Sequence, residues 1–317
     1  MKQALSRVKK ILTGSTIAPH LNHVRVHKGF LHATDGRLFA SVPCGQTEDF
    51  TVPAAEMDRA LSFDKLTIQV EETRVLFKSG RTRISLGRLD DAAYPLLSPP
   101  SEAKWRRFTP VFLDRMKRAR DFVSANATQG WAMTVMVMEK EVVATNNVVL
   151  ACIENDDTPY LGMIPVWLVD FLLAAEEQPV EIADMGDSIA LRWADGAWVH
   201  SLKVVGEFPT QAVQLAIDMR GRKAKWEIPE EWREVYLKTL PFSDRNIQVD
   251  PDRIWAHSEK AQIETEISSP IQGPSVWDPK FPGPVLEVAS HWDIVDYPKP
   301  TFFHGPGIRG IIVGKVA

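Results

Sequence analysis

Two short stretches of the chain, HATDGRLFA (32–40) and VATNNVVLA (143–151), share one pattern. Each contains Ala-Thr followed by Asp or Asn, then an apolar run typical of a strand, and each ends in Ala. They stand roughly 110 residues apart, about the length of a small domain. One echo of this length can arise by chance, and its meaning depends on whether the surrounding sequence repeats in the same order.

The first third of the chain predicts a helix, then strands, a second helix and further strands. MKQALSRVKKILTG (1–14) has apolar residues at helical spacing and a terminal glycine, which indicates an amphipathic helix. Alternating strand-like runs with turn residues follow over 23–42. VPAAEMDRAL (52–61) predicts a second helix, and the unit closes at the Pro-rich segment DDAAYPLLSPP (90–100).

The second third passes through the same order. FTPVFLDRMKRARDFVS (108–124) predicts a helix with Thr109 as N-cap and Pro110 at the first helical position. IPVWLVDFLL (164–173) stands where VPAAEMDRAL (52–61) stood, at nearly the same spacing as the echo. Near its end, Phe208-Pro209 repeats the Tyr-Pro pair of the first third.

The final third follows the pattern more faintly. WEIPEEWREVYLKTL (226–240) and FPGPVLEVASHWDIV (281–295) predict its two helices, and the chain closes with a strand in TFFHGPGIRGIIVGKVA (301–317). The echo therefore belongs to a unit of roughly 105–115 residues, present clearly twice and a third time weakly. We predict an α+β fold of three tandem domains, each with two helices packed on antiparallel sheet. Three unrelated α+β domains remain the alternative.

Composition indicates an ordinary globular protein. The 317 residues are 44% hydrophobic and 25% charged, with a net charge of −4 from 37 basic and 41 acidic residues. Contact with nucleic acid would therefore depend on local segregation of charge. Two cysteines without paired spacing suit a reducing compartment, and no apolar run approaches the length of a membrane span. We expect a soluble, cytoplasmic protein without a membrane partner.

Four segments together resemble a known family. TRVLFKSGRTRISLGRLDDAAYP (73–95) resembles the end of the first domain of bacterial DNA sliding clamps, the beta subunit family of DNA polymerase III. SLKVVGEFP (201–209) resembles the matching end of the second clamp domain. ATNNVVLA (144–151) stands where the family carries Thr-Asp-Gly-His-Arg-Leu, and GIIVGKVA (310–317) stands where it ends in a partner-binding tail.

The resemblance implies a protomer of three clamp domains, at 1–104, 105–215 and 216–317, that dimerises head-to-tail into a ring of six domains. Such a ring encircles duplex DNA without reading its sequence and acts as a processivity factor in DNA replication, with helices lining the hole. The polymerase and the clamp loader would bind through short peptide motifs. This chain is shorter than typical bacterial members, which suits a phage or mobile-element version, although host or phage origin stays open.

A sliding ring attracts phosphates without base contacts, so the resemblance implies basic residues on the first helix of each domain. Gln129, in the loop SANATQGW (124–131), stands where the family contacts DNA, and the neighbouring Trp131 is either a DNA contact or a core residue. Ordinary solvated helix faces are the alternative for the charged residues. The implied DNA-binding residues are Lys2, Lys9, Lys10, Arg115, Lys117, Arg118, Arg120, Gln129, Arg233 and Lys238.

The resemblance also implies a hydrophobic cleft between the second and third domains, where partner peptides bury one or two apolar anchors. Its implied residues are Thr145, Asn147, Val148, Val149, Leu150, Leu215, Ile217, Ile312, Val313 and Lys315. Val148 and Val149 replace a His-Arg pair of the family, and the tail end around Lys315 is not Met-rich. These departures leave peptide specificity open.

The chain carries no sequence motif that would indicate an enzyme. It lacks GxGxxG, Walker-type GxxxxGK[ST], GxSxG and HExxH, and its eight histidines have no metal-ligand spacing. We therefore expect no catalytic residues, no metal and no cofactor. A multi-domain α+β enzyme, or a phage structural protein with an unrecognised site, remains the alternative function.

Overall fold

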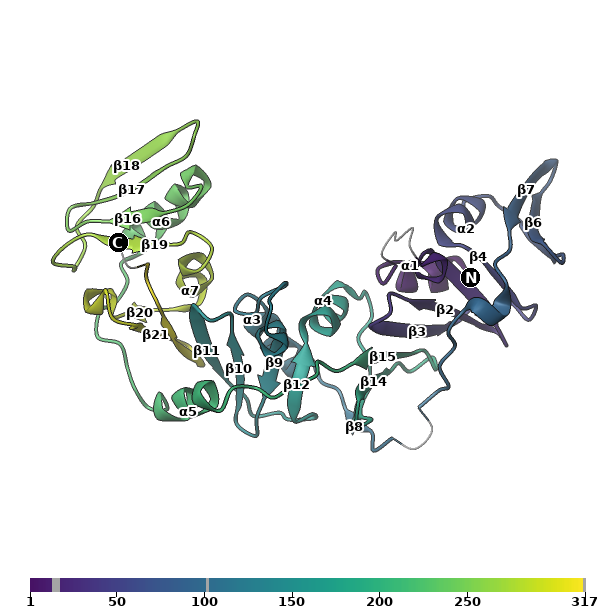
Figure 1. The fold of residues 1–317 in the computed structure, drawn as a ribbon, viewed down its shortest axis with the longest axis horizontal. Coiled ribbons are helices and arrows are strands. Elements are labelled where there is room, and N and C mark those ends of the chain that lie inside the picture. Colours follow the sequence, from purple (N-terminus) through teal and green to yellow (C-terminus); the bar gives the residue numbers. More distant parts are fainter. Residues whose placement is uncertain (13–17, 101–102, 316–317) are drawn as a thin grey trace. The chain divides into compact units, whose positions relative to one another are not determined.

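The computed structural model describes residues 1–12, 18–100 and 103–315. Within these residues it contains seven α-helices and four β-sheets (Figure 1). The chain divides into two compact units, one formed by Met1–Pro110 with Trp167–Lys203, the other by Val111–Val166 with Val204–Ala317. Each unit therefore combines segments that are far apart in the sequence.

The first unit is built on an eight-stranded antiparallel sheet in the order β4-β1-β2-β3-β15-β14-β13-β8. The strands from the start of the chain are β1 (His23–His27), β2 (Phe30–Thr34), β3 (Leu38–Pro43) and β4 (Phe50–Pro53). The strands from the middle are β8 (Arg106–Arg107), β13 (Glu181–Asp184), β14 (Ser188–Arg192) and β15 (Trp198–Leu202). The two sets join where β3 pairs with β15.

Helices and a smaller sheet complete the first unit. The helices are α1 (Lys2–Lys9), α2 (Ala54–Ala60) and, apart from its first residue, α4 (Val166–Ala174); the smaller sheet is β5 (Thr67–Val70), β6 (Arg74–Ser79) and β7 (Thr82–Gly87). α1 buries Ala4, Leu5 and Val8, as its apolar spacing predicts. It ends at Lys9, before the predicted stop at Gly14, which lies outside the described residues.

The second unit contains a seven-stranded sheet in the order β12-β9-β10-β11-β22-β21-β20 and a four-stranded sheet in the order β18-β17-β16-β19. The larger sheet comprises β9 (Thr134–Val137), β10 (Glu141–Thr145), β11 (Val149–Glu154), β12 (Gly162–Pro165), β20 (His291–Trp292), β21 (Thr301–Gly305) and β22 (Ile308–Ile312). The smaller one comprises β16 (Ile247–Val249), β17 (Arg253–His257), β18 (Gln262–Glu266) and β19 (Ser275–Trp277). Its helices are α3 (Pro110–Arg120, apart from its first residue), α5 (Thr210–Asp218), α6 (Glu230–Thr239) and α7 (Pro282–Val288).

Two predicted segments differ in the structure. The helix predicted over 281–295 ends at Val288, because Ser290 and the two residues after it pair with β21, where the Ser290 N–H donates to the His304 carbonyl at 2.9 Å. Tertiary strand pairing outweighs the local helical pattern there. The stretch after Pro209, for which no helix was predicted, forms α5.

Strand register confirms the repeat, including its faint third copy. His32 lies opposite Ser41, Val143 opposite Cys152, and Trp255 opposite Glu264. From each copy to the next, both members of the pair advance by the same number of positions, so the three pairs are equivalent. Since a slip of one residue would turn every side chain to the opposite face, three equal registers indicate one architecture.

The third copy is faint in sequence because aromatic residues fill its core. Trp277 pairs with Ile247 at the position where Val52 and Ile164 stand in the other copies. It is fully buried with Trp232 and Trp292. The Trp292 N–H donates to the Thr301 hydroxyl at 2.7 Å, so its polar group is satisfied in the core.

Candidate functional site

An apolar cleft of about 450 Å³ lies in the second unit, between α5 and the strands β10, β11 and β22. Its size is within the range of ligand-binding pockets. The lining residues are Trp131, Thr145, Asn147, Val148, Val149, Leu150, Pro209, Gln211, Ala212, Leu215, Pro300, Ile311 and Val313.

The tight turn between β10 and β11 forms one end of the cleft. Asn147 adopts a left-handed backbone conformation (φ 74°), which asparagine tolerates better than most residues. The Asn146 carboxamide oxygen accepts the N–H groups of Val148 and Val149 at 3.1 and 2.9 Å, and the Thr145 hydroxyl accepts the Asn147 N–H at 3.2 Å. The polar residues of the echo therefore hold the turn, and the valines after it line the cleft.

The floor of the cleft depends on close contact between two strands. Leu150 of β11 lies opposite Ile311 of β22, so both side chains share one face. Gly310 makes the approach possible, because a β-carbon there would lie 2.3 Å from the Leu150 carbonyl oxygen and 2.3 Å from the Phe303 ring. A larger residue would separate the strands or displace the ring.

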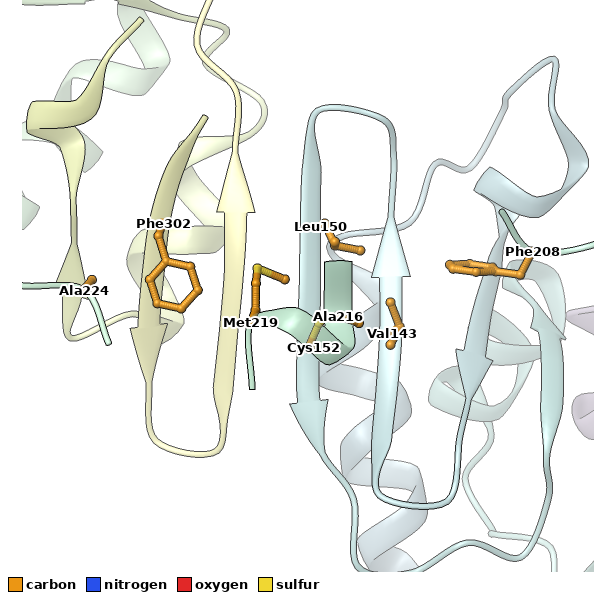
Figure 2. Close-up of a cluster of buried hydrophobic side chains, with 8 residues drawn as sticks. All are labelled: Val143, Leu150, Cys152, Phe208, Ala216, Met219, Ala224 and Phe302. Carbon is orange, nitrogen blue, oxygen red and sulfur yellow. The ribbon is translucent and has the colours of Figure 1, made fainter. Parts of the chain in front are cut away.

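Helix α5 forms the other wall. Ala216 is buried in α5 and belongs, with Met219 just beyond the helix, to the same hydrophobic cluster as Val143 and Cys152 (Figure 2), whereas Leu215 lines the cleft. The cluster comprises Val143, Leu150, Cys152, Phe208, Ala216, Met219, Ala224 and Phe302. The helix is thus fixed by one face and offers another to the cleft.

A buried carboxylate anchors α5 at its end. Glu141 of β10 pairs with Arg309 of β22 and accepts a hydrogen bond at 3.0 Å from Arg220, just after the helix. Arg309 also donates to the carbonyl of Ala216 at 3.2 Å. Removing one partner would leave a buried charge uncompensated, so this group fixes helix and strands together.

The structure brings together most of the predicted cleft residues. Thr145, Asn147, Val148, Val149, Leu150, Leu215 and Val313 all line the cleft. Ile217, Ile312 and Lys315 do not line it. Ile312 is fully buried, since it alternates in direction with Ile311, and the Lys315 ammonium instead pairs with Asp278 at 3.4 Å.

Sequence reasoning missed Trp131, Pro209, Gln211, Ala212, Pro300 and Ile311. Ile311 was detectable, because strand alternation places it on the face opposite to that of Ile312. Ala212 and Gln211 belong to α5, a helix that was not predicted from the sequence. Trp131 is half-buried, contacts Phe208 with ring centroids 6.1 Å apart and lines the cleft, which is a third role beside the two considered for it.

The basic residues of α1 are largely engaged within the first unit. The Lys9 ammonium lies 2.5 Å from the Asp58 carboxylate of α2, and the Lys10 ammonium donates to the Ala174 carbonyl. Lys2 is exposed and forms no ion pair among the described residues. Of the three lysines predicted to contact DNA here, Lys2 alone has no partner within that part of the chain.

In α3 the basic residues differ in their partners. Arg115 pairs with Asp114 at 3.1 Å, and Arg118 donates to the Pro306 carbonyl at 2.7 Å. Arg120 donates to the Val123 carbonyl at 3.4 Å. Lys117 is exposed and has no ion pair within the described part of the chain.

The remaining residues predicted to contact DNA form ion pairs or hydrogen bonds within the protein. Arg233 of α6 pairs with Glu230 at 3.2 Å, and Lys238 pairs with Glu234 at 3.0 Å one turn away. The Gln129 carboxamide oxygen accepts a hydrogen bond at 3.1 Å from Asn147. Gln129 therefore lies beside the cleft.

Reactive groups are few in the described part of the chain. Burial raises the pKa of the Cys152 thiol to about 12, so this cysteine stays protonated. Within residues 1–12, 18–100 and 103–315, no group of three or more His, Cys, Asp or Glu side chains is placed to hold a metal ion. In the same ranges, every helix is too short or too polar to cross a bilayer.

Comparison with solved structures identifies the fold. The chain is similar to DNA polymerase III subunit beta from Pseudomonas aeruginosa (17% identity, TM-score 0.77) and to the beta sliding clamp of Caulobacter crescentus (15%, 0.79). It is also similar to the Helicobacter pylori beta clamp (13%, 0.74). Each match covers 100% of this chain and 97% of the other. No protein-family model and no curated protein matches the sequence. The chain has the sliding-clamp fold with three clamp domains.

Proposed function

We propose that this protein is a DNA polymerase processivity factor, a sliding clamp that encircles duplex DNA and tethers the replicative polymerase through its apolar cleft. The observation that carries the proposal is that cleft, formed by α5 and the joint between β11 and β22 in a chain that follows the clamp fold from end to end. Such a protein works by binding and has no reaction of its own. This role would place it in the cytoplasm, with the DNA.

The domain boundaries of this proposal are those expected from the sequence, 1–104, 105–215 and 216–317. Each domain then shares a continuous sheet with the next, through β3–β15 at the first junction and β11–β22 at the second. Since these ladders consist of backbone hydrogen bonds, they join domains without requiring particular side chains. This explains how the joints can persist at low sequence identity.

Two strand edges support a head-to-tail dimer. In the four-stranded sheet β18 is terminal and corresponds by register to β3 and β11. In the three-stranded sheet β7 is terminal and corresponds by order to β15 and β22. An unpaired edge is a template for pairing, so β18 of one protomer can pair with β7 of a second, which closes a ring of six domains.

Charge supports the same pairing. Val75–Leu86 in the β6–β7 ladder corresponds to Ile189–Ser201 in β14–β15, so Arg83 corresponds to Trp198. Ser41 lies opposite Trp198 in the β3–β15 ladder, and Ser41 corresponds to Glu264 of β18. If β18 and β7 pair in the register of β3 and β15, Glu264 lies opposite Arg83. Opposite charges at facing positions stabilise a strand pair, and the reversed arrangement would repel.

Two of the similar solved structures hold bound molecules, which supports a binding role for the cleft. One Caulobacter crescentus clamp holds polyethylene glycol at its beta-motif tethering region, and a Pseudomonas aeruginosa clamp is bound to griselimycin. In this chain, the cleft offers apolar walls with polar groups at the β10–β11 turn. We propose that short peptides of the polymerase and the clamp loader bury apolar side chains there.

A topological experiment tests the proposal. The protein is diluted until it is monomeric, mixed with covalently closed circular DNA, concentrated to reform dimers and passed over a sizing column. We expect protein to travel with the circle and to be released when a restriction enzyme linearises it, because a ring slides off free ends. Equal retention on circular and linear DNA would indicate ordinary surface binding, and a chain that stays monomeric when concentrated would refute the ring.

A further inference from the structure

The first unit contains a second cavity, of about 290 Å³, on its eight-stranded sheet. Phe30 and His32 of β2, Ser41 of β3 and Trp198 of β15 form its floor, and the connector Leu96–Pro99 forms its other wall. His27 and Lys28 complete the lining at the turn between β1 and β2. This volume is near the lower end of ligand-binding pockets.

The strand registers identify the equivalent sheet face in the second unit, where a segment of the chain itself covers it. By the offset that relates the first two copies, His32 corresponds to Val143 and Ser41 to Cys152. Trp198 then corresponds to Arg309, because Trp198 lies opposite Ser41 and Arg309 lies opposite Cys152. In the second unit Ala216 and Met219, in and just after α5, share one buried hydrophobic cluster with Val143 and Cys152 (Figure 2). A peptide segment with apolar side chains is thus the natural cover of this sheet face.

The connector of the first unit leaves the face open. The Tyr94 hydroxyl donates to the His32 carbonyl at 3.1 Å and fixes the start of the connector. Leu96 to Pro99 then run without a helix, and Leu96 and Leu97 each remain 37% exposed. The buried Glu141–Arg309 pair that fastens α5 is absent here, since its positions are occupied by Phe30 and Trp198. The aromatic side chains of Phe30 and Trp198 therefore stand where the second unit has a buried ion pair.

The rings give this cavity a defined surface. His32 has the ring centroids of His27, Phe30 and Trp198 at 6.3, 6.5 and 6.4 Å. Trp198 is only 6% exposed, so the rings present a fixed floor. Such a floor suits the insertion of a large apolar side chain.

The charged residues around the cavity indicate which group would stand next to the inserted apolar side chain. The lining contains Lys28 and two histidines, and no Asp or Glu among the described residues. The nearby Asp49 is already engaged, because one oxygen accepts the Lys28 N–H at 3.1 Å and the other pairs with His27. The Lys28 ammonium is exposed and has no ion pair in the described ranges. An acidic group beside the apolar one would therefore find an unmatched cation at the mouth.

We propose that this cavity is a second peptide-binding site, which takes a segment of a partner protein with a large apolar side chain next to an acidic residue. The site is separate from the cleft at α5 and does not depend on the proposed clamp function. The partner segment would cover the first unit as α5 covers the second.

Binding can be measured by methyl NMR with two matched probes, acetyl-Asp-Leu-Phe-amide and acetyl-Lys-Leu-Phe-amide. The protein carries Leu215→Asp, which weakens apolar binding at the cleft, and binding is read from Leu96 and Leu97, which line only the cavity of the first unit. We expect the acidic peptide to shift the Leu96 and Leu97 methyl signals saturably and to bind about five- to tenfold more tightly than the basic one, the effect of one charge contact near the surface.

Two variants complete the experiment. Lys28→Glu should remove the preference for the acidic peptide, and Ser98→Trp should abolish binding of both by filling the mouth; unchanged methyl signals elsewhere show that each variant is folded. Equal affinity for both peptides, no saturable shift at Leu96 and Leu97, or full binding by Ser98→Trp would each overturn the proposal.

Discussion

At the scale of single residues, Gly310 controls how closely β11 and β22 approach, because its missing side chain leaves room for Leu150 and Phe303. We expect Gly310→Ala to lower the free energy of unfolding by about 2 kcal/mol or more, the cost of overpacking a core site. It should also weaken peptide binding in the cleft. Urea unfolding measures the first effect and calorimetric titration the second.

Gly273→Ala is the matched control, since a β-carbon at Gly273 has no neighbour within 4 Å. Equal stability of the two variants would mean that the strand joint tolerates a side chain and that the floor of the cleft is less tightly packed than described.

His32 makes stability depend on pH. Burial lowers its pKa to about 4, from an ordinary value of 6.5, with help from the charge of His27. A base with a depressed folded-state pKa contributes stability above 6.5 that is lost as the pH falls toward 4. Between about pH 7.5 and pH 5 we expect a loss on the order of 2 kcal/mol from this residue.

The measurement compares urea unfolding of the wild type and His32→Gln at both pH values. The variant should lose less stability on acidification, while His200 and His304, whose pKa values burial also lowers, keep contributing in both proteins. Identical losses in the two proteins would show that His32 does not become charged on unfolding in this range.

At the scale of elements, α5 tests the cleft because it carries two similar side chains with different surroundings. Leu215 lines the cleft and is 46% exposed, whereas Ile217 is 43% exposed and lies away from it. We expect Leu215→Asp to weaken binding of acetyl-Ser-Leu-Phe-amide about tenfold or more, and Ile217→Asp to change it little. Calorimetric titration of both variants decides, and equal losses would argue against the cleft as the binding site.

Helix α3 provides the corresponding test for DNA. Lys117 is exposed without an ion pair in the described chain, while Arg115 and Arg118 have partners. Lys117→Glu should weaken association with duplex DNA and reduce the slope of log K against log salt by roughly one per protomer. Fluorescence anisotropy across a salt series measures both.

The control for this helix is Lys140→Glu, an exposed lysine in the turn between β9 and β10. If both variants lose affinity equally, the effect is one of net charge and α3 does not face the DNA.

At the scale of the whole molecule, the dimer predicts a charge-swap rescue. Arg83→Glu or Glu264→Arg alone should weaken dimerisation about tenfold or more, because each places like charges opposite one another at both interfaces. The double variant restores opposite charges and should recover the dimer. Light scattering over a dilution series measures the mass, and a double variant no better than the singles would refute this register.

The sequence by itself determined the repeat and much of the cleft. The turn and the apolar strand around Thr145 and Asn147 are a local signal, recorded twice in the chain, whereas their place in a cleft was implied by the resemblance to the sliding-clamp family. The nearly constant spacing between equivalent landmarks persists in the strand registers. Turns and strands can be predicted in this way because helix and strand propensity and apolar alternation depend on only a few neighbouring residues.

The tertiary structure alone decided how the repeats share their sheets and which charges are free. The pairing of β11 with β22 joins residues from opposite halves of the chain, as between Leu150 and Ile311, and nothing local specifies it. The same holds for Lys9 with Asp58, where a basic helix face expected to be free is partly neutralised by a neighbouring helix. Long-range pairs depend on the whole chain folding, so no short stretch of sequence could reveal them.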